Sequence, residues 1–372
     1  MKLGLPPKKK PRTEPLGASS SGPSCPSSDP GSSSVPEYSS ITELMKAYPL
    51  DEDPSHLADA TPHPRDPSIR FEEKTHTYFV NYHQDDAKNP DEFCHQGHLS
   101  ASGIIHRYFK DFDADEAIRC MRLGRKWGSS HPLYGKRDDE IKQFWEENRV
   151  RCADEGTWYH GLLERDLNGT TLGGFPSLAE SPFAQLEAVQ QYLKWKRECF
   201  DPYFEAFRTE HRMRGDIGLL LTGTLDLCAV RRGHPPPEQC DGVLTLNIFD
   251  WKFSQNIKTF DPYANAVTGK GYGVDLCSDL QDTNFSHYCL QQSLYKYMLE
   301  TFYPEWTWKG MKYTSVRVES MHLAVFHENH APSGKILEVE DLRGHIEQIL
   351  AARRKEVAGL EGFAKETTQE AH

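Results

Sequence analysis

The sequence predicts an α/β fold with a mixed central sheet flanked by helices. Strand-like apolar runs follow one another in the middle of the chain, and patterns with helical periodicity surround them. An order of helix, three strands, helix and strand is typical of domains in which helices cover the faces of one sheet. The strand-like runs are 204–213, 219–230, 243–253 and 316–326, and the helical ones are 184–196 and 285–301.

Further elements are expected before and after this core. Residues 69–80 alternate between apolar and polar side chains on both sides of a Glu-Lys pair, which is typical of a β-hairpin. Residues 104–122 and 138–167 have apolar residues at helical spacing, and a helix at 339–357 completes the chain. We find no internal repeat.

The overall charge is acidic. The 372 residues include 43 Lys plus Arg against 55 Asp plus Glu, so the formal net charge is −12. This excludes an electrostatic coat on nucleic acid, which needs net positive charge, but it allows a nuclease with a local basic groove. No stretch approaches the roughly 18 apolar residues of a membrane-spanning helix, so we expect a soluble protein without membrane insertion.

The nine cysteines are scattered, and none forms a Cys-x-x-Cys pair. Neither a zinc knuckle nor an iron–sulfur cluster is therefore indicated. Free thiols in a reducing compartment are the simplest expectation.

The first 60 residues have the composition of a disordered tail. Residues 17–40 include 11 serines together with Gly and Pro, and little that can enter a core. The run Lys8–Arg12 is similar to a signal read by a nuclear import receptor, which favours a nuclear location; a solvated basic tail in the cytoplasm is the alternative. Residues 61–372 are expected to form one domain.

Three residues of the predicted helix 138–167 form the first chemical pattern. Gly156, His160 and Glu164 are four residues apart and therefore lie on one helix face. The glycine leaves room for a ligand or a neighbouring backbone, and the other two side chains point the same way. Taken alone, a surface His–Glu pair explains this pattern better.

Two strand-like runs contain carboxylates. Asp226 lies in 219–230, where burial is costly without a partner such as a metal ion. A strand-end aspartate bonded to a loop explains it equally well.

Asp250 and Lys252 are two residues apart near the end of 243–253 and so share a strand face. A carboxylate that holds a hard cation, beside an ammonium that orients water or stabilises charge on phosphorus, fits a reaction on phosphate. An ordinary ion pair on a solvated strand is the alternative, and the apolar residues before Asp250 argue against it.

Together and in this order, these patterns resemble the PD-(D/E)xK nuclease superfamily, specifically its RecB-like and λ-exonuclease-like branch with virus-encoded relatives. The resemblance spans roughly residues 69–326 and implies a restriction-endonuclease-like αβββαβ core. The matching positions are the hairpin Phe71 to Val80, Leu99 to Ser102, Gly156, His160 and Glu164, the strand glutamate Glu210, Gly223-Thr-Leu-Asp226, Asp250-Trp-Lys252 and Gln291-Gln-Ser-Leu-Tyr295.

The resemblance also implies roles. One or two Mg²⁺ or Mn²⁺ ions would be bound by His160, Asp226, Asp250 and the Trp251 carbonyl, with help from Glu164 and Glu210. Lys252 would position the water nucleophile. Gln291 and Tyr295 would contact the substrate backbone, although a tyrosine in such a helix is more often a core residue.

Two features depart from the family pattern. Asp250 stands where many relatives carry Glu, and a Pro-rich insert at 233–240 lengthens the connection between Asp226 and Asp250. We expect this insert to be a surface loop that leaves the site intact. The four-cysteine iron–sulfur staple of some RecB-like relatives is absent from the sequence.

Two further groups of residues are weaker candidates for substrate binding. Lys270 lies in a glycine-rich segment after the Asp-x-Lys strand and could meet phosphate, although a flexible connection explains the segment as well. Arg125 and Lys126 lie beside Trp127, as in grooves that guide a nucleic-acid strand, or at a solvated helix end.

The sequence therefore predicts a Mg²⁺- or Mn²⁺-dependent deoxyribonuclease with exonuclease-like processing of DNA in repair, recombination or replication. The alternatives are a catalytically inactive nucleic-acid-binding module on the same fold and an interaction protein that uses its Ser/Pro-rich tail. Exonuclease or endonuclease action, strandedness and oligomeric state are left open.

Overall fold

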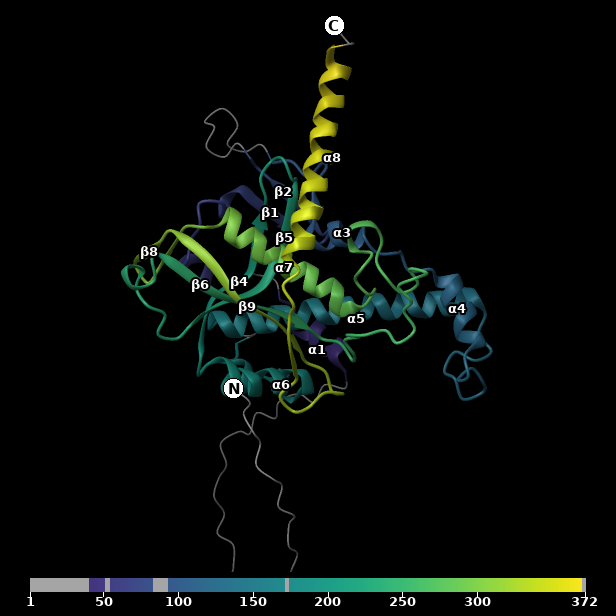
Figure 1. The fold of residues 1–372 in the computed structure, drawn as a ribbon. Helices are drawn as coiled ribbons and strands as arrows, with labels where there is room; N and C mark the ends of the chain where they lie inside the picture. Colours follow the sequence, from purple (N-terminus) through teal and green to yellow (C-terminus); the bar gives the residue numbers. More distant parts are fainter. Residues whose placement is uncertain (1–39, 51–53, 83–92, 171–173, 370–372) are drawn as a thin grey trace, which may run out of the picture. The chain divides into compact units, whose positions relative to one another are not determined.

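A mixed sheet forms the centre of the molecule (Figure 1). The computed structural model describes residues 40–50, 54–82, 93–170 and 174–369, and six strands of these residues form this sheet. Its strands are β3 (Leu99–Ser100), β4 (Phe204–Arg214), β5 (Leu221–Arg231), β6 (Val243–Lys252), β9 (Ser315–Val325) and β10 (Lys335–Glu338).

The strand order explains why β6 is apolar on both faces. β6 lies between β5, to which it is antiparallel, and β9, to which it is parallel, and β10 pairs with the outer edge of β9. The outer edge of β5 pairs with β4 in antiparallel fashion, and β3 pairs in parallel with the start of β5. Strands in such central positions are covered on both faces and therefore lack the alternation of half-exposed strands.

Helices cover both faces of the sheet (Figure 1). One apolar cluster joins the sheet to α3, α7 and α8, and a second joins its other face to α1, α5 and α6. The predicted α/β fold with a mixed sheet flanked by helices is thus confirmed. The helices are α1 (Ile41–Ala47), α2 (His56–Ala60), α3 (Ala101–His106), α4 (Ala114–Leu123), α5 (Asp138–Asn168), α6 (Glu187–Trp195), α7 (Asn284–Phe302) and α8 (Arg343–Gln369).

Two small hairpins accompany the sheet. The predicted hairpin at 69–80 is present as β1 (Ile69–Glu72) and β2 (Thr77–Val80). A second hairpin, β7 (Trp306–Trp308) and β8 (Met311–Tyr313), and the strand β10 were not predicted from the sequence. The predicted insert at 233–240 joins the ends of β5 and β6 that lie away from Asp250, and most of it is exposed or half-exposed.

The helix predicted at 104–122 is two helices. α3 ends near Arg107, and α4 begins anew at Asp113, whose side chain accepts a hydrogen bond from the Glu116 backbone N–H at 3.0 Å. An aspartate in this position satisfies a backbone donor that a continuous helix would have satisfied itself. The prediction of one helix was wrong because helical spacing alone does not show such a cap.

The expectation that all of residues 1–60 are disordered is also corrected. Residues 41–47 and 56–60 are helical, and Leu44 of α1 is 1% exposed against the α5 side of the sheet. The basic run Lys8–Arg12 and the serine-rich segment up to residue 39 lie outside the described residues. The described residues all belong to one structural unit. None of the helices in the described part of the chain is both long and apolar enough to cross a membrane.

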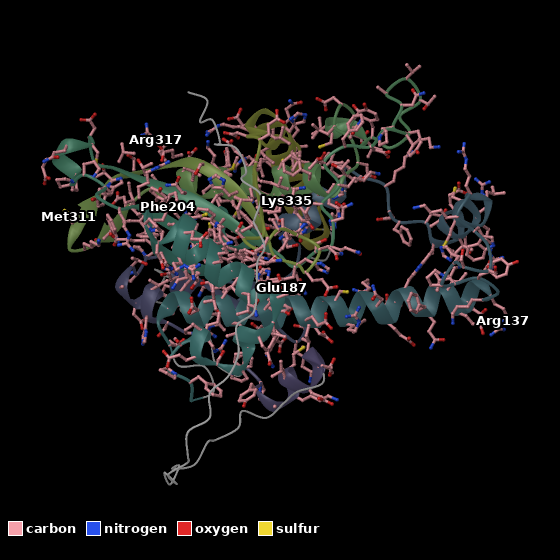
Figure 2. The ribbon with its side chains drawn as sticks, turned by 90° about the horizontal axis from the view of Figure 1, so that it is seen from below. Arg137, Glu187, Phe204, Met311, Arg317 and Lys335 are labelled. Carbon is pink, nitrogen blue, oxygen red and sulfur yellow. The ribbon has the colours of Figure 1, made fainter. Side chains whose placement is uncertain are left out.

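The long helix α5 connects two regions of this unit. Its 31 residues correspond to about 46 Å. Figure 2 shows it running from Arg137, away from the sheet, to the sheet itself. The start of α5 packs with α4 in a small apolar cluster around Ile141, whereas Trp158 to Leu163 pack against the sheet.

Candidate functional site

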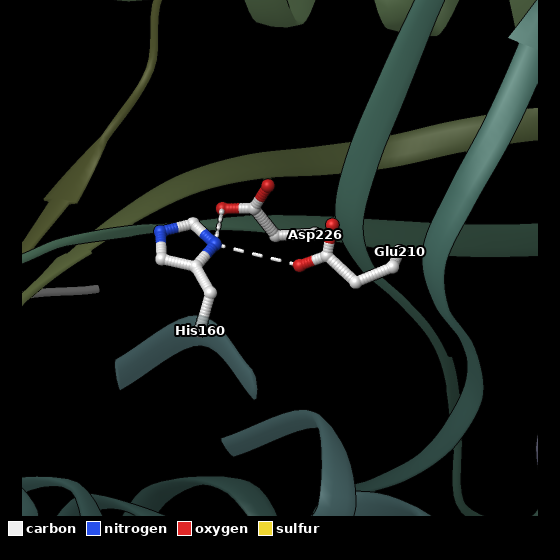
Figure 3. Close-up of side chains that lie close together, drawn as sticks. All are labelled: His160, Glu210 and Asp226. Carbon is white, nitrogen blue, oxygen red and sulfur yellow. Dashed lines mark hydrogen bonds and ion pairs between the residues drawn. The ribbon is translucent and has the colours of Figure 1, made fainter. Parts of the chain in front are cut away.

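His160, Glu210 and Asp226 converge between α5 and the sheet (Figure 3). One donor atom from each residue lies within 4.8 Å of the others. His160 Nδ1 is 3.4 Å from Glu210 Oε1 and 3.7 Å from Asp226 Oδ2. An imidazole nitrogen and two carboxylate oxygens at this spacing form a group that can hold a metal ion.

The strand register brings the two carboxylates together. The pairs His211 with Leu225 and Thr209 with Leu227 bracket Glu210 and Asp226, which therefore lie opposite each other on β4 and β5. Both side chains lie on the sheet face that α5 covers, because Nδ1 of His160 on α5 faces both of them (Figure 3).

The backbone of β4 is irregular at Glu210, and this changes which side chains face α5. Glu210 has a φ of 41°, an uncommon conformation for a residue with a side chain. Thr209, its neighbour, also faces α5, since its Oγ1 accepts a hydrogen bond from Asn168 Nδ2 at 2.8 Å. Two consecutive residues of β4 thus point to the same side, which a regular strand does not allow. The strained backbone turns the Glu210 carboxylate toward His160.

Asp226 also links β5 to β6 where their backbones separate. The last backbone pair between these strands is Leu227 with Phe249. Beyond it, the Trp251 backbone N–H donates to Asp226 Oδ2 at 2.7 Å. The Asp226 side chain thus accepts the hydrogen bond that a backbone carbonyl of β5 would accept in a continuous ladder. The gap between the strands therefore opens beside the three-residue cluster, and Asp226 is held at its edge.

Asp250 and Lys252 lie at the same gap, on the strand face turned toward α7. Asp250 is 2% exposed and forms an ion pair with Lys252. The Lys252 ammonium lies 4.7 Å from the ring centroid of Tyr288 on α7. Trp251 between them points the opposite way into the core, as predicted from strand periodicity.

The buried charges shift one another's pKa values. Burial lowers the pKa of His160, but Asp226 and Glu210 outweigh it and raise the value to about 9. Burial raises the pKa of Asp250 to about 6, with a contribution from Asp226 and against the effect of Lys252. Burial likewise raises the pKa of Asp226. Each shift shows that several negative groups share a small, poorly solvated volume, which favours a cation.

A cleft of about 980 Å³ opens above the cluster. One wall is α5, with His160 and the 7%-exposed Glu164, and the facing wall comes from β4, β5 and the β1–β2 hairpin. Gly156 also lines the cleft, as its position on the face of His160 and Glu164 predicts. The predicted metal ligands Glu210 and His160 therefore reach solvent through this cleft.

Other predicted residues are placed differently. Tyr295 is 3% exposed, its hydroxyl accepts a hydrogen bond from Gln291 Nε2 at 3.1 Å, and its ring lies against Gly223. It is a core residue, as the alternative interpretation of the sequence had it, and its burial does not offer the predicted contact with a substrate backbone.

The three predicted basic contacts do not line this cleft. Lys270 is exposed, and its charge acts on Glu116 and Cys120 of α4. Arg125 and Lys126 are exposed after α4, near the start of α5. His160 is 22 residues beyond Asp138, so about 33 Å of helix separates it from that end.

Several cleft residues were not predicted from the sequence, and two of them lie beside the cluster. Arg212 and Thr224 line the cleft and pair with each other one step along the strands from Glu210 and Asp226. Since residues two apart share a strand face, the positions 210 and 226 were themselves sufficient to predict 212 and 224.

Comparison with models of known protein families gave no match, and no curated protein matches the chain.

Proposed function

We propose that the protein is a metal-dependent nuclease that hydrolyses DNA phosphodiester bonds, with a restriction-endonuclease-like core of the PD-(D/E)xK type. The observation that favours this is the convergence of two groups at one gap in the sheet. His160, Glu210 and Asp226 form a cation-binding cluster open to a cleft, and the Asp250–Lys252 pair lies at the same gap.

The donor set fits Mg²⁺ or Mn²⁺. Two carboxylates supply the oxygen ligands that both ions prefer, and the imidazole is better suited to Mn²⁺ than to Mg²⁺. The cleft leaves room for water and a phosphate oxygen beside the protein ligands. A bound cation would polarise a phosphodiester and lower the pKa of a bound water.

The chain's own residues would hold the reacting groups. His160, Glu210 and Asp226 would bind the ion, and the Trp251 N–H keeps the Asp226 carboxylate in position. Lys252, held by Asp250, donates to the attacking water or to the phosphate oxygens. The water oxygen would form a bond to phosphorus and release one proton to solvent in the cleft, while the bond from phosphorus to the leaving oxygen breaks and that oxygen takes up a proton from solvent.

The test compares labelled linear, nicked and closed circular DNA in Mg²⁺ and in Mn²⁺. Wild-type protein is expected to cleave linear DNA, and Lys252→Ala to be slower by about 100-fold or more, the usual effect of removing one group that stabilises transition-state charge. Lys258→Ala is the matched control, because Lys258 is exposed and pairs with Asp261. Equal cleavage by Lys252→Ala, with a normal circular dichroism spectrum, contradicts the proposal.

Metal binding is measured separately. Asp226→Asn is expected to weaken Mn²⁺ binding by at least tenfold in calorimetry, since it removes the charge of one of the two carboxylate ligands. Unchanged Mn²⁺ affinity would place the ion elsewhere.

A further inference from the structure

The β1–β2 hairpin carries a group of aromatic side chains into the cleft. Phe71, His76 and Tyr78 all line it. The rings of Phe71 and Tyr78 are 4.5 Å apart at their centroids, and His76 meets Phe71 edge-on at 5.8 Å. Phe71 and Tyr78 are half-buried and His76 is exposed, so this group is partly accessible from the cleft.

This hairpin is attached to the strand that bears Asp226. The Tyr78 hydroxyl and Thr224 Oγ1 form a hydrogen bond of 2.7 Å. Thr224 precedes Asp226 by two residues and shares its strand face, so the two are about 7 Å apart along β5. The aromatic group therefore contacts β5 only two residues away from Asp226 of the cation-binding cluster, and it lines the same cleft.

Positive charge lies beside the rings. The guanidinium carbon of Arg212 is 5.9 Å from the Phe71 ring centroid, and Lys74 lines the cleft at the hairpin turn. His76 occupies that turn with a φ of 51°, and its Nδ1 is 2.7 Å from the Glu73 carbonyl oxygen. The turn geometry thus fixes the imidazole at the edge of Phe71.

Aromatic rings interleaved with cations bind unpaired nucleotides, because every base offers a π-face and every nucleotide a phosphate. In a duplex those faces are covered by neighbouring bases, so a ring can reach one only after the base is unstacked. The carboxylates of the cluster would not attract a phosphate without a cation, whereas Arg212 and Lys74 carry the opposite charge.

We propose that Phe71 and His76 form a stacking subsite for an unpaired base of single-stranded DNA. This inference rests on the proposed function, since it places a neighbouring phosphate of the same strand at the cation-binding cluster. Arg212 contacts the backbone between the base and that phosphate. The protein therefore engages single strands or frayed ends in preference to intact duplex.

The experiment measures binding in Ca²⁺ by fluorescence anisotropy, with fluorescein-labelled oligothymidylate as the probe. Phe71→Leu keeps an apolar side chain against Tyr78 but removes the π-face. It is expected to weaken binding to the single strand by about 5- to 100-fold, the usual contribution of one stacked base, and to change duplex binding little. Phe71→Trp is expected to restore affinity. Phe79→Leu is the matched control, because Phe79 lies on the opposite face of β2, against His95.

A single abasic nucleotide moved along the probe locates the subsite. Wild-type protein is expected to bind more weakly when the abasic nucleotide stands at one particular position of the probe. Phe71→Leu, which has already lost the stacking ring, is expected to bind that probe no more weakly than the intact one. Equal losses for wild type and Phe71→Leu at every position, or equal weakening of single-strand and duplex binding, overturn the stacking subsite. If abasic sensitivity appears but Lys252→Ala cleaves DNA normally, the proposed function fails while the subsite stands.

Discussion

Two glycines show how the surroundings of a residue decide what it contributes. A Cβ built on Gly223 lies 2.7 Å from Cε1 of Tyr295, closer than side-chain atoms pack. A Cβ built on Gly156 meets no atom within 4 Å beyond its chain neighbours and the backbone of its own helix, and its position lines the cleft. Gly223 therefore allows α7 to pack against β5 beside Asp226, whereas Gly156 adds no side chain of its own to the α5 wall of the cleft.

We expect Gly223→Ala to lower the free energy of unfolding by about 1–3 kcal/mol, because the added methyl group overpacks a closed part of the core. Urea unfolding followed by circular dichroism measures this. Gly156→Ala serves as the comparison, because the added methyl group enters open space, and it is expected to raise the free energy of unfolding by about 0.5–1 kcal/mol, since alanine favours a helix interior. Equal effects of the two substitutions would show that the Tyr295 contact is not restrictive.

At the scale of single elements, α1 gives the segment before the first strand a fixed place on α5. Leu44 is buried in the cluster that contains Trp158, and the Trp158 indole N–H donates to the Tyr48 carbonyl at 3.3 Å. The Ser40 side chain accepts from the Glu43 backbone N–H and so caps the helix. These contacts place α1 beside the part of α5 that contains His160.

Leu44→Ala is expected to destabilise the protein by about 2–4 kcal/mol, since it removes a buried side chain from a closed cluster. Lys46→Ala serves as the comparison, because Lys46 lies exposed on the same helix. The midpoints of urea unfolding provide the measurement. A Leu44→Ala midpoint equal to that of wild type would mean that α1 is not part of the cooperative unit.

The elements that the sequence predicted well are those with long, regular patterns. The strands β4, β5, β6 and β9 and the helix α7 follow from their apolar runs. Leu44 was missed because the serine-rich composition around residues 17–40 hides a short amphipathic stretch. The strand β10 was missed because only four residues form it.

The candidate site was predictable to a similar degree. His160 and Asp226 follow from helix and strand spacing, because these periods fix which side chains share a face. The φ of Glu210 and the gap after Leu227 depend on how two strands meet, and no local pattern shows that. Lys270 was expected near the site on chain order alone, which does not fix where the connection of 31 residues between Lys252 and Asn284 lies.

At the scale of the whole described unit, α5 couples the sheet to the α4 region. Its first half is mostly exposed and is lined by ion pairs such as Arg149 with Glu146 and Arg151 with Glu155, and its second half is buried against β4. Exposed pairs of this kind contribute little stability each. The stability of the unit is therefore concentrated around the sheet, where buried groups also make it sensitive to pH.

Two buried histidines create that sensitivity. His63 and His211 both pack against Tyr303 and Trp306, with ring centroids 4.6–5.6 Å apart. Burial lowers the pKa of His63 to about 4, although Asp66 raises it, and lowers that of His211 well below its ordinary value. His63 Nδ1 accepts the Arg65 backbone N–H at 3.1 Å, and neither ring nitrogen of His211 has a hydrogen-bond partner among the described residues.

Because both histidines have folded-state pKa values below the ordinary value of about 6.5, the unfolded chain binds more protons than the folded one once the pH falls below about 6.5. Their stabilising contribution is complete above pH 6.5 and falls by about 1.4 kcal/mol per pH unit for each residue as the pH approaches 5. His211→Phe fills the same aromatic pocket without a titratable group. Between pH 7.5 and 5, we expect the unfolding free energy of His211→Phe to fall by about 2 kcal/mol less than that of wild type. Urea unfolding at the two pH values measures this difference. The exposed His95→Gln should follow wild type, and a His211→Phe profile parallel to wild type would mean that His211 takes up its proton equally readily in the folded and the unfolded protein.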